Sequence, residues 1–384
     1  MTTTTPVQTP AARPPLLTRP LLLRFVTVIG ASASFFLLLS VVPLYAQASG
    51  GDAGLATGAL MLATVCGELA TPRLVARFGY RVALMVGLVL LGAPALVLTA
   101  SDNFGWIVAV CFVRGLGFAL TVVAGGALTA ALIPAERRGE GLALAGIVSG
   151  VPSLVALPLG VWLADSAGFT PVCVAGGLVA LAAAVVVPGL PGRQPSADKA
   201  VGVIAGLHSG ALARPAVVFA TTALGAGIIV TFLPLAVPTS MSGLVTAVLF
   251  LQPAAATVAR WFAGRIGDRR GAAGLVLPGL LLSAAGLLVT ALTGSAVAVL
   301  TGVTLFGIGF GIAQNATLTL MYARVPESGY GTVSALWNFA YDAGMGVGAV
   351  GYGAIAAHTG YPVAFALTAA LMLLALWPAC RDRR

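Results

Sequence analysis

The chain has 384 residues, of which 59% are hydrophobic and only 8% are charged, and its mean hydropathy is +1.03. A soluble domain carries about 25% charged residues, so this composition excludes a soluble globular protein and predicts an all-α membrane protein. Twenty basic residues against eleven acidic ones give a net charge of +9, and the positions of these residues decide what the excess means.

Twelve apolar segments follow a polar, Thr- and Pro-rich stretch at residues 1–20, which we expect to be a disordered cytoplasmic tail. A membrane-spanning helix needs roughly 20 mainly apolar residues. The first apolar run is too long for the core of a signal peptide, so we expect it to remain as the first helix. The predicted spans are residues 22–46, 53–72, 81–100, 106–132, 140–164, 168–190, 215–238, 241–262, 273–293, 297–323, 331–356 and 361–380.

One connection, residues 191–214, is longer than the others and divides the twelve predicted spans into two sets of six. It is too short to form a soluble domain, and we interpret it as a cytoplasmic linker. The sequence therefore predicts a six-helix bundle over residues 21–190, a second six-helix bundle over residues 215–380, and a short cytoplasmic tail over residues 381–384.

The basic residues are distributed very unequally between the two sides of the membrane. With twelve spans, nineteen of the twenty Lys and Arg residues fall on the side of the two termini, and Arg114 lies inside a span. The opposite side holds Asp52, Asp102 and Asp165 and no basic residue. Because cytoplasmic loops are enriched in Lys and Arg, both termini are predicted to be cytoplasmic. The cations are dispersed among loops, which argues against nucleic-acid binding.

A shift of 192 positions, half the chain, brings several residue types into register. Because each half has an even number of spans, both copies enter the membrane in the same orientation. This predicts parallel repeats related by an axis along the membrane normal. The shift aligns Gly115, Gly117 and Pro134 with Gly307, Gly309 and Pro326, and it aligns Arg73, Arg77 and Gly79 with Arg265, Arg269 and Gly271.

The segment after the eighth span runs from Gly264 to Gly271 as Gly-Arg-Ile-Gly-Asp-Arg-Arg-Gly, and it resembles the cytoplasmic loop signature of the major facilitator superfamily. Its functional members would be Gly264, Asp268, Arg269 and Gly271. The first copy keeps Arg73, Arg77 and Gly79, while Pro72 and Ala76 replace the leading glycine and the aspartate.

Two further segments carry the resemblance. Arg114 with Gly117 is similar to part of a second superfamily motif, and residues 338–344 are similar to bacterial sugar-efflux and metallophore-efflux proteins. The resemblance implies two six-helix bundles around a central cavity, in a bacterial inner membrane, that transport a small molecule by alternating access.

A charged side chain in hydrocarbon is costly, so an ionisable residue inside a span is a candidate functional residue. Asp342 lies about 11 residues into its predicted span, roughly 16 Å deep and close to the midplane. Asn338 is one turn earlier on the same face, and Trp337 and Tyr341 form the adjacent stripe. A carboxyl group that gains and loses a proton here would couple protons to transport; a fixed contact with a neighbouring helix is the alternative.

Arg114 lies in the outer half of the fourth predicted span. A guanidinium does not lose its proton in proteins, so this residue would hold a substrate anion or favour the ionised form of a carboxyl group. A structural ion pair is equally expected. Gln252, Gln314 and Asn315 add neutral hydrogen-bonding groups at intermediate depth, with hydrogen bonds between helices as their alternative role.

Glu68 and Arg260 occupy equivalent positions in the two copies, near the cytoplasmic ends of their predicted spans. We expect them to pair across the pseudo-twofold axis when the cytoplasmic side is closed, with other loop charges as alternative partners. By the resemblance, Asp268 is expected near a helix N-terminus, around residues 138–141, where the helix dipole favours an anion. That contact would stabilise one of the two access states.

The sequence holds no phosphate loop, no Ser/His/Asp set and no cluster of metal ligands, so neither ATP hydrolysis nor a cofactor is expected. An intramembrane enzyme or a channel is the least favoured class. The four isolated cysteines are expected to be small buried side chains without disulfides. We predict a monomeric secondary transporter that exports a small apolar drug or metabolite in exchange for protons. The alternative is proton-coupled uptake of a sugar or another small polar nutrient.

Overall fold

The computed structural model describes residues 15–134, 138–192, 209–238, 241–325 and 330–381. Within these ranges the regular structure is helical and no β-strand occurs. The first group of helices is α1 (Arg19–Leu39), α2 (Val41–Ala48), α3 (Ala53–Leu96), α4 (Phe104–Leu132), α5 (Arg138–Ala167) and α6 (Phe169–Ala184). The second is α8 (Gly210–Ala236), α9 (Ser242–Arg270), α10 (Ala273–Thr290), α11 (Ala296–Ala323), α12 (Tyr330–Thr359), α13 (Tyr361–Met372) and α14 (Leu376–Arg381).

Ten helical segments of the described chain are long and apolar enough to cross a membrane. They show a multi-pass integral membrane protein, as the composition predicts. One of the ten contains all of α3, and α12, with 30 residues, is not among them. The number of twelve spans therefore stays a prediction.

The second and third predicted spans are joined through a single glycine. The helix runs past Pro72, where the sequence predicted its end, and turns sharply at Gly79, whose φ is 82° and ψ is 168°. This splits α3 into two arms, residues 53–78 and 80–96. A side chain at position 79 would also meet the carbonyl oxygen of Gly192, so both the backbone angle and the space require glycine.

The segment predicted as a loop after the eighth span is helical up to Arg270. Arg269 and Arg270 lie in the last turn of α9, where basic side chains interact favourably with the negative end of the helix dipole. The helix ends at Gly271, whose φ is 84° and whose N–H donates to the Gly267 carbonyl at 2.8 Å. The residues that the sequence analysis predicted as a loop therefore form the end of α9.

The 192-residue repeat is confirmed by the backbone. The left-handed glycines Gly79 and Gly271 are 192 positions apart, and so are Gly168 and Gly360. The starts of α4 and α11, of α5 and α12, and of α6 and α13 are separated by the same number. Because these features are set by local turns and caps, their recurrence at one spacing shows two copies of one structural unit.

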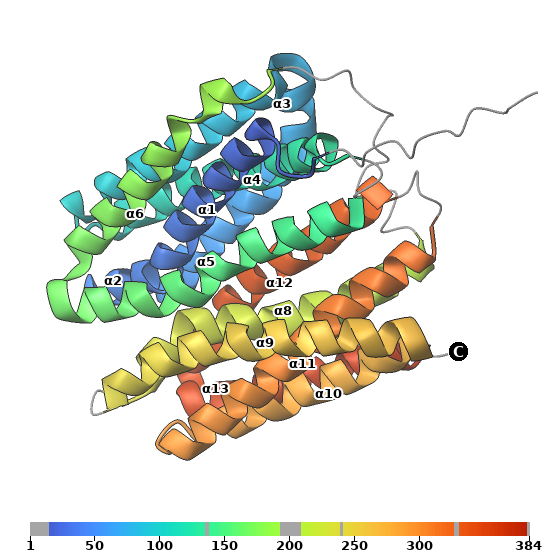
Figure 1. Cartoon of the computed structure of the whole chain (residues 1–384). Helices are drawn as coiled ribbons and strands as arrows, with labels where there is room; N and C mark the ends of the chain where they lie inside the picture. Colours follow the sequence, from blue (N-terminus) through green and yellow to red (C-terminus); the bar gives the residue numbers. More distant parts are fainter. Residues whose placement is uncertain (1–14, 135–137, 193–208, 239–240, 326–329, 382–384) are drawn as a thin grey trace, which may run out of the picture.

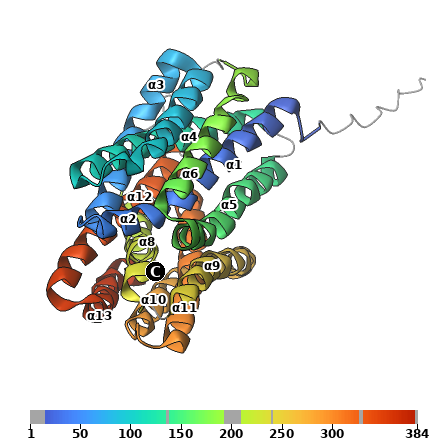
Figure 2. The same cartoon turned by 90° about the vertical axis from the view of Figure 1, so that its left-hand side faces the viewer.

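Two groups of helices build the molecule. In the first, α1 packs against α5 and α6, and α3 packs against α4 and α6. In the second, α8 packs against α11 and α12, and α10 against α11 and α13. Figures 1 and 2 show the blue-to-green helices of the first group above the yellow-to-red helices of the second, with α12 along the boundary. The groups meet mainly where α3 packs against α12 and α5 against α9.

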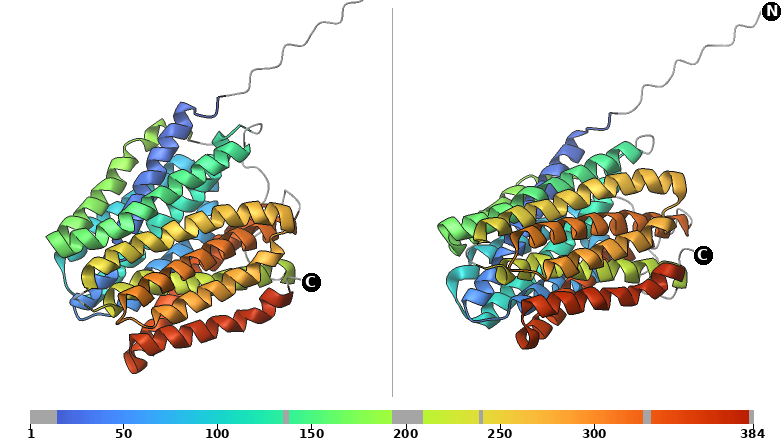
Figure 3. Two further views of the ribbon diagram at one scale, coloured as in Figure 1. Left: turned by 60° about the horizontal axis from the view of Figure 1, so that its bottom comes forward. Right: turned by 90° about the horizontal axis from the view of Figure 1, so that it is seen from below.

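The two ends of the molecule differ in how closely the groups approach. We call the end where α8 begins and α14 ends the linker side, and the opposite end the far side. The groups converge on the far side and diverge toward the linker side (Figure 3, left). On the far side, Thr57 of α3 and Thr231 of α8 share a hydrogen bond of 3.1 Å, and a side chain on Gly58 would meet Val350. The far side is therefore the closed one.

Two expectations about single segments were wrong. The last residues of the predicted tail are structured: α1 begins at Arg19, with Pro20 in its first turn, and Leu16 is buried against Phe25 and Ile133. Residues 1–14 lie outside the described part of the chain. Of the four cysteines, Cys111 and Cys173 are buried, but Cys66 and Cys380 are exposed. A cysteine side chain behaves as a small apolar group, so it is as stable against lipid chains as in a protein core.

Candidate functional site

Glu68 of α3 and Asp342 of α12 meet at the boundary between the two groups. Asp342 is 5% exposed, and both carboxyl oxygens of Glu68 are buried with no hydrogen-bond donor among the described residues. The two carboxyl groups are within hydrogen-bonding reach of one another. An ionised carboxylate only accepts hydrogen bonds, so a hydrogen bond between the two groups requires a proton on one of them. The site is a buried carboxyl pair that can share a proton.

The pair lies at mid-depth. Asp342 is twelve residues after the start of α12, about 18 Å along the helix, and Glu68 is eleven residues before the turn at Gly79, about 16 Å. The sequence placed Glu68 near the end of its predicted span at residue 72, whereas the helix itself continues beyond Pro72 to the turn at Gly79. The longer helix brings Glu68 to the depth of Asp342.

Arg260 does not pair with Glu68 in this structure. Its Nη1 donates to Oε1 of Gln314 on α11 at 3.4 Å. A side chain on Gly264 would lie 3.4 Å from Nδ2 of Asn315, so α9 and α11 adjoin through polar residues here. The predicted pairing of Glu68 with Arg260 belongs to a molecule closed on the linker side, whereas this one is closed on the far side.

Trp337 and Tyr341 of α12 pack into the second group of helices. Trp337 stacks on Phe219 of α8, with 4.2 Å between ring centroids and 11° between planes, and its Nε1 donates to Thr317 Oγ1 at 3.2 Å. The Tyr341 ring lies nearly parallel to both of these rings, 6.0 Å from Phe219 and 6.5 Å from Trp337 between centroids. Adjacent helical residues point about 100° apart, so the packing of Tyr341 directs Asp342 toward α3.

The predicted amide residues lie on three different helices, α9, α11 and α12. Asn338 is half-buried one turn before Asp342, and Gln252 is buried on α9, where its backbone carbonyl faces Gly307. Among the described residues, no hydrogen bond joins Gln252, Gln314 and Asn338. The convergence of these three side chains on one cavity, which would favour a sugar, stays a prediction.

Arg114 is 1% exposed and lies inside the first group. Its Nη2 donates to the Ser34 carbonyl of α1 at 3.3 Å, and its Nε donates to the Leu91 carbonyl of α3 at 3.3 Å. The structure does not bring it to Asp342. Its hydrogen bonds hold α4 against α1 and α3.

Arg24 is a buried charge that the sequence analysis counted among the cytoplasmic residues. Because α1 begins at Arg19, Arg24 lies inside the helix and is 5% exposed. It donates to the Gly125 carbonyl at 3.0 Å, to Thr129 Oγ1 at 3.2 Å and to Thr27 Oγ1 at 2.6 Å. The stripe formed by Thr121, Gly125 and Thr129 at four-residue spacing on α4 was the available sequence signal.

The comparisons with known proteins agree with this architecture. Residues 22–349 match the family model described as "Major Facilitator Superfamily". The chain belongs to the major facilitator superfamily. It is therefore a membrane transporter of small molecules, working by secondary transport, and not an enzyme.

Solved structures share the superfamily fold over nearly the whole chain. One is the nucleoside transporter NupG, at 12% identity with a TM-score of 0.72, where the match covers 95% of this chain and 99% of that one. Its D323A mutant matches at 11% identity with a TM-score of 0.73, covering 95% and 100%. Another is the human organic anion transporter MFSD10 (TETRAN), at 18% identity with a TM-score of 0.66, covering 94% and 99%. No curated protein matches the chain in sequence.

The superfamily signature residues lie at the linker side of this transporter. Gly79 and Gly271 form the two equivalent turns, and Arg77 lies over the ring of Phe78, 5.2 Å from its centroid. Arg73 and Arg269 are exposed near these turns. The side chains of Asp268 and of residues 138–140 lie outside the described part of the structure, so the expected contact between them stays a prediction.

Proposed function

We propose that this protein is a proton-coupled exporter, which moves a small, largely apolar drug or metabolite out of the cell in exchange for protons. The Glu68–Asp342 pair is the observation that supports this proposal. The two carboxyl groups belong to the two groups of helices that move relative to one another in alternating access. Their protonation and the access state are therefore coupled.

The coupling follows from the charge of the pair. Two ionised carboxylates held together in a low-dielectric site repel one another, so contact between α3 and α12 at this depth requires a shared proton. When the proton leaves, repulsion separates the groups and favours opening on the far side. There the carboxylates meet water and take up a proton, which restores the closed far side. One proton moving across 100 mV supplies about 2.3 kcal/mol, enough to bias the two states.

The membrane arrangement in this proposal is that of the sequence analysis. Twelve spans form two parallel six-helix bundles around a central cavity, over residues 21–190 and 215–380, with residues 191–214 as the linker. Both termini are cytoplasmic, so the linker side faces the cytoplasm of a bacterial cell and the protein works as a monomer in the inner membrane. The structure is then the state closed to the outside.

The signature residues at the linker side complete the cycle in this proposal. The turns at Gly79 and Gly271 place the basic residues Arg73, Arg77 and Arg269 at the cytoplasmic surface, where Asp268 would contact the start of α5 when that side closes. Closure of the linker side would also move Glu68 away from Asp342 and toward Arg260. With Arg260 as its partner, Glu68 would no longer need to share a proton with Asp342.

The side chains near the pair favour an apolar cargo. Trp337, Asn338 and Tyr341, which precede Asp342 on α12, are uncharged, so a molecule with few charges fits best. The second candidate is proton-coupled uptake of a sugar or another small polar nutrient. The likeness in fold to NupG, a nucleoside transporter, supports this second candidate.

A pH-gradient assay in everted membrane vesicles tests the proposal. Adding the exported compound to an antiporter should dissipate an imposed gradient, and both Asp342→Asn and Glu68→Gln should abolish this response while the protein remains in the membrane. Asp165→Asn is the matched control, because Asp165 is exposed at the end of α5, away from the pair. Unchanged pH dependence in the Asp342→Asn variant would contradict the coupling role.

A panel screen in whole cells separates export from uptake. Cells that express the exporter should tolerate several toxic compounds better than cells that express Asp342→Asn. Greater accumulation of a labelled nucleoside or sugar, without any gain in tolerance, would support the uptake candidate instead.

A further inference from the structure

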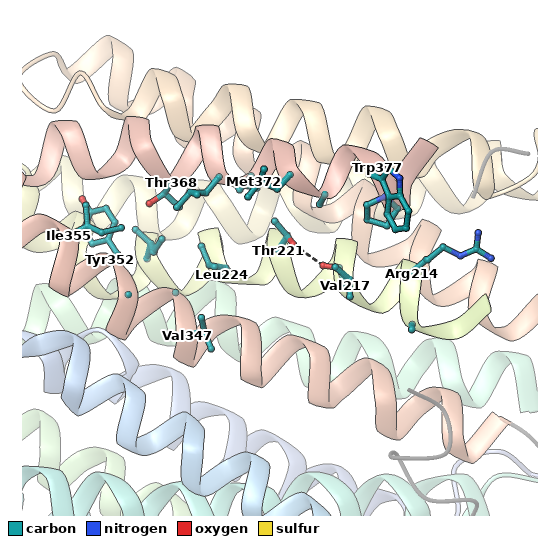
Figure 4. Close-up of a pocket in the computed structure, with 18 residues that line it drawn as sticks. Arg214, Val217, Thr221, Leu224, Val347, Tyr352, Ile355, Thr368, Met372 and Trp377 are labelled. Carbon is teal, nitrogen blue, oxygen red and sulfur yellow. Dashed lines mark hydrogen bonds between the residues drawn. The ribbon is translucent and has the colours of Figure 1, made fainter. Parts of the chain in front are cut away.

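A long apolar groove runs along the outer surface of the second group of helices. It has a volume of about 570 Å³ and lies between α8, α12 and the α13–α14 segment (Figure 4). Leu224 and Ile228 of α8 and Val347 of α12 line it, together with Met372 of α13. No acidic side chain is among the residues that line it.

The mouth of the groove faces outward, where the bilayer surrounds the protein. Val217 is 49% exposed, Val347 is 64% exposed and Leu374 is 74% exposed. Apolar side chains this exposed are stable in a membrane-spanning region only against lipid chains. The groove is thus accessible to lipid.

The two ends of the groove have different chemistry. Tyr352 and Ile355 lie at one end, and Arg214 and Trp377 lie at the other, with the Arg214 guanidinium extending beyond it (Figure 4). Nε of Arg214 donates to the Gly210 carbonyl at 2.8 Å, which fixes the side chain at the linker-side start of α8.

A second cation lies next to the linker-side end. The Arg381 guanidinium lies 4.2 Å from the centroid of the Trp377 ring. Trp and Arg together are typical of the level at which a span reaches the lipid headgroups.

We propose that this groove binds one anionic diacyl phospholipid. An acyl chain would lie along α8 between Val217 and Ile228, and the phosphate would contact Arg214 and Arg381. Basic pockets between membrane helices are known to favour anionic headgroups, and a groove without acidic side chains offers nothing to the cation of a zwitterionic headgroup. The inference requires only that the chain spans a bilayer, and it is independent of the proton-coupling proposal.

Trp377 is a native reporter for the occupant, because bromine atoms on a lipid chain quench a nearby indole. The full chain would be placed in nanodiscs of phosphatidylcholine that contain a small fraction of either brominated phosphatidylglycerol or brominated phosphatidylcholine. The signal of Trp377 is the difference between the unmodified chain and Trp377→Phe. Quenching by phosphatidylglycerol should reach its midpoint at an about 30-fold lower fraction, as expected for ~1 kcal/mol from each of the two arginines, Arg214 and Arg381.

The control variants separate a built site from general surface charge. Arg214→Gln should reduce the difference between the two lipids to about fivefold, because Arg381 remains, whereas Arg265→Gln should leave the difference at about 30-fold. Arg265 lies 3.8 Å over the Trp261 ring on α9, so it is also an arginine–tryptophan contact near the linker side but lies outside the groove. Thr221→Phe, which fills the groove, should weaken quenching by both lipids.

Four results would overturn the inference. The first three are equal midpoints in the unmodified chain, an undiminished preference for phosphatidylglycerol in Arg214→Gln, and a preference that Arg265→Gln reduces as much as Arg214→Gln does. Reversal of the quenching by soluble glycerol 3-phosphate would show a headgroup-only site and would also overturn it. Retained helical content and a monodisperse elution profile confirm that each variant is folded.

Discussion

The hydrogen bond between Thr57 and Thr231 holds the far side closed, and removing one partner should open it. The bond joins α3 to α8 across the two groups at 3.1 Å, and the two residues are 2% and 0% exposed. Thr231→Val keeps the shape of the side chain but leaves the Thr57 hydroxyl buried without its partner. When the far side opens, that hydroxyl can bond to water instead.

The size of the effect follows from the cost of the orphaned group. A buried hydroxyl without a partner costs about 1–2 kcal/mol. That cost applies only to the closed far side, so it shifts the equilibrium toward opening by roughly 5- to 30-fold. In the double variant Thr57→Val/Thr231→Val no hydroxyl is orphaned, and the shift should fall to about twofold. The double variant should therefore resemble the unmodified protein more than either single variant does.

Thiol labelling measures this equilibrium. Met61 is 1% exposed and packs near Gly346 between α3 and α12, so Met61→Cys becomes reactive only when the groups separate there. In a background with the four native cysteines replaced by serine, the labelling rate should follow the open fraction. Thr222→Val is the matched control, because Thr222 is buried on the same helix and donates within it, to the Phe219 carbonyl at 2.9 Å.

Two outcomes would refute the reasoning. One is a double variant whose shift equals the combined shifts of the single variants, since the two hydroxyls would then act independently. The other is a Thr222→Val variant that opens the far side as much as Thr231→Val does. The opening would then follow the loss of any buried threonine hydroxyl and would not depend on the hydrogen bond to Thr57.

Two pairs of glycines give further predictions, each measured by thermal unfolding in detergent. Gly271→Ala forces a left-handed backbone on alanine and should lower the free energy of unfolding by about 1–2 kcal/mol. Gly79→Ala should lower it by more, because the added side chain would also meet a backbone carbonyl. A greater loss of stability in Gly271→Ala than in Gly79→Ala would contradict the structure. Gly125→Ala should displace the Arg24 guanidinium from its carbonyl and hydroxyl acceptors and cost about 2 kcal/mol or more. Gly126→Ala, where no atom lies within 4 Å, should have little effect, and equal losses at positions 125 and 126 would rule out the packing argument.

The sequence by itself determined the class of protein and its repeated architecture. Each segment that crosses the hydrocarbon must have apolar side chains and must satisfy its own backbone hydrogen bonds. A run of apolar residues therefore identifies a span without knowledge of the neighbouring helices. The turn glycines Gly79 and Gly271 were visible because a left-handed backbone angle is a local requirement. Asp342 could be identified as a candidate functional residue from the sequence, because a carboxyl group inside a span is energetically costly whatever it contacts.

The tertiary structure alone decided which polar groups meet. Glu68 contacts Asp342 because α3 continues past Pro72 and crosses α12 at that depth, and neither the helix end nor the crossing can be read from local hydropathy. Arg114 and Arg24 are buried by contacts of the same kind. The acceptors of Arg114 are backbone carbonyls of α1 and α3, and Arg24 has acceptors on α4 in addition to Thr27 of its own helix. Burial of a charge can be inferred from its own segment, but its partner depends on how helices far apart in the chain are rotated against each other.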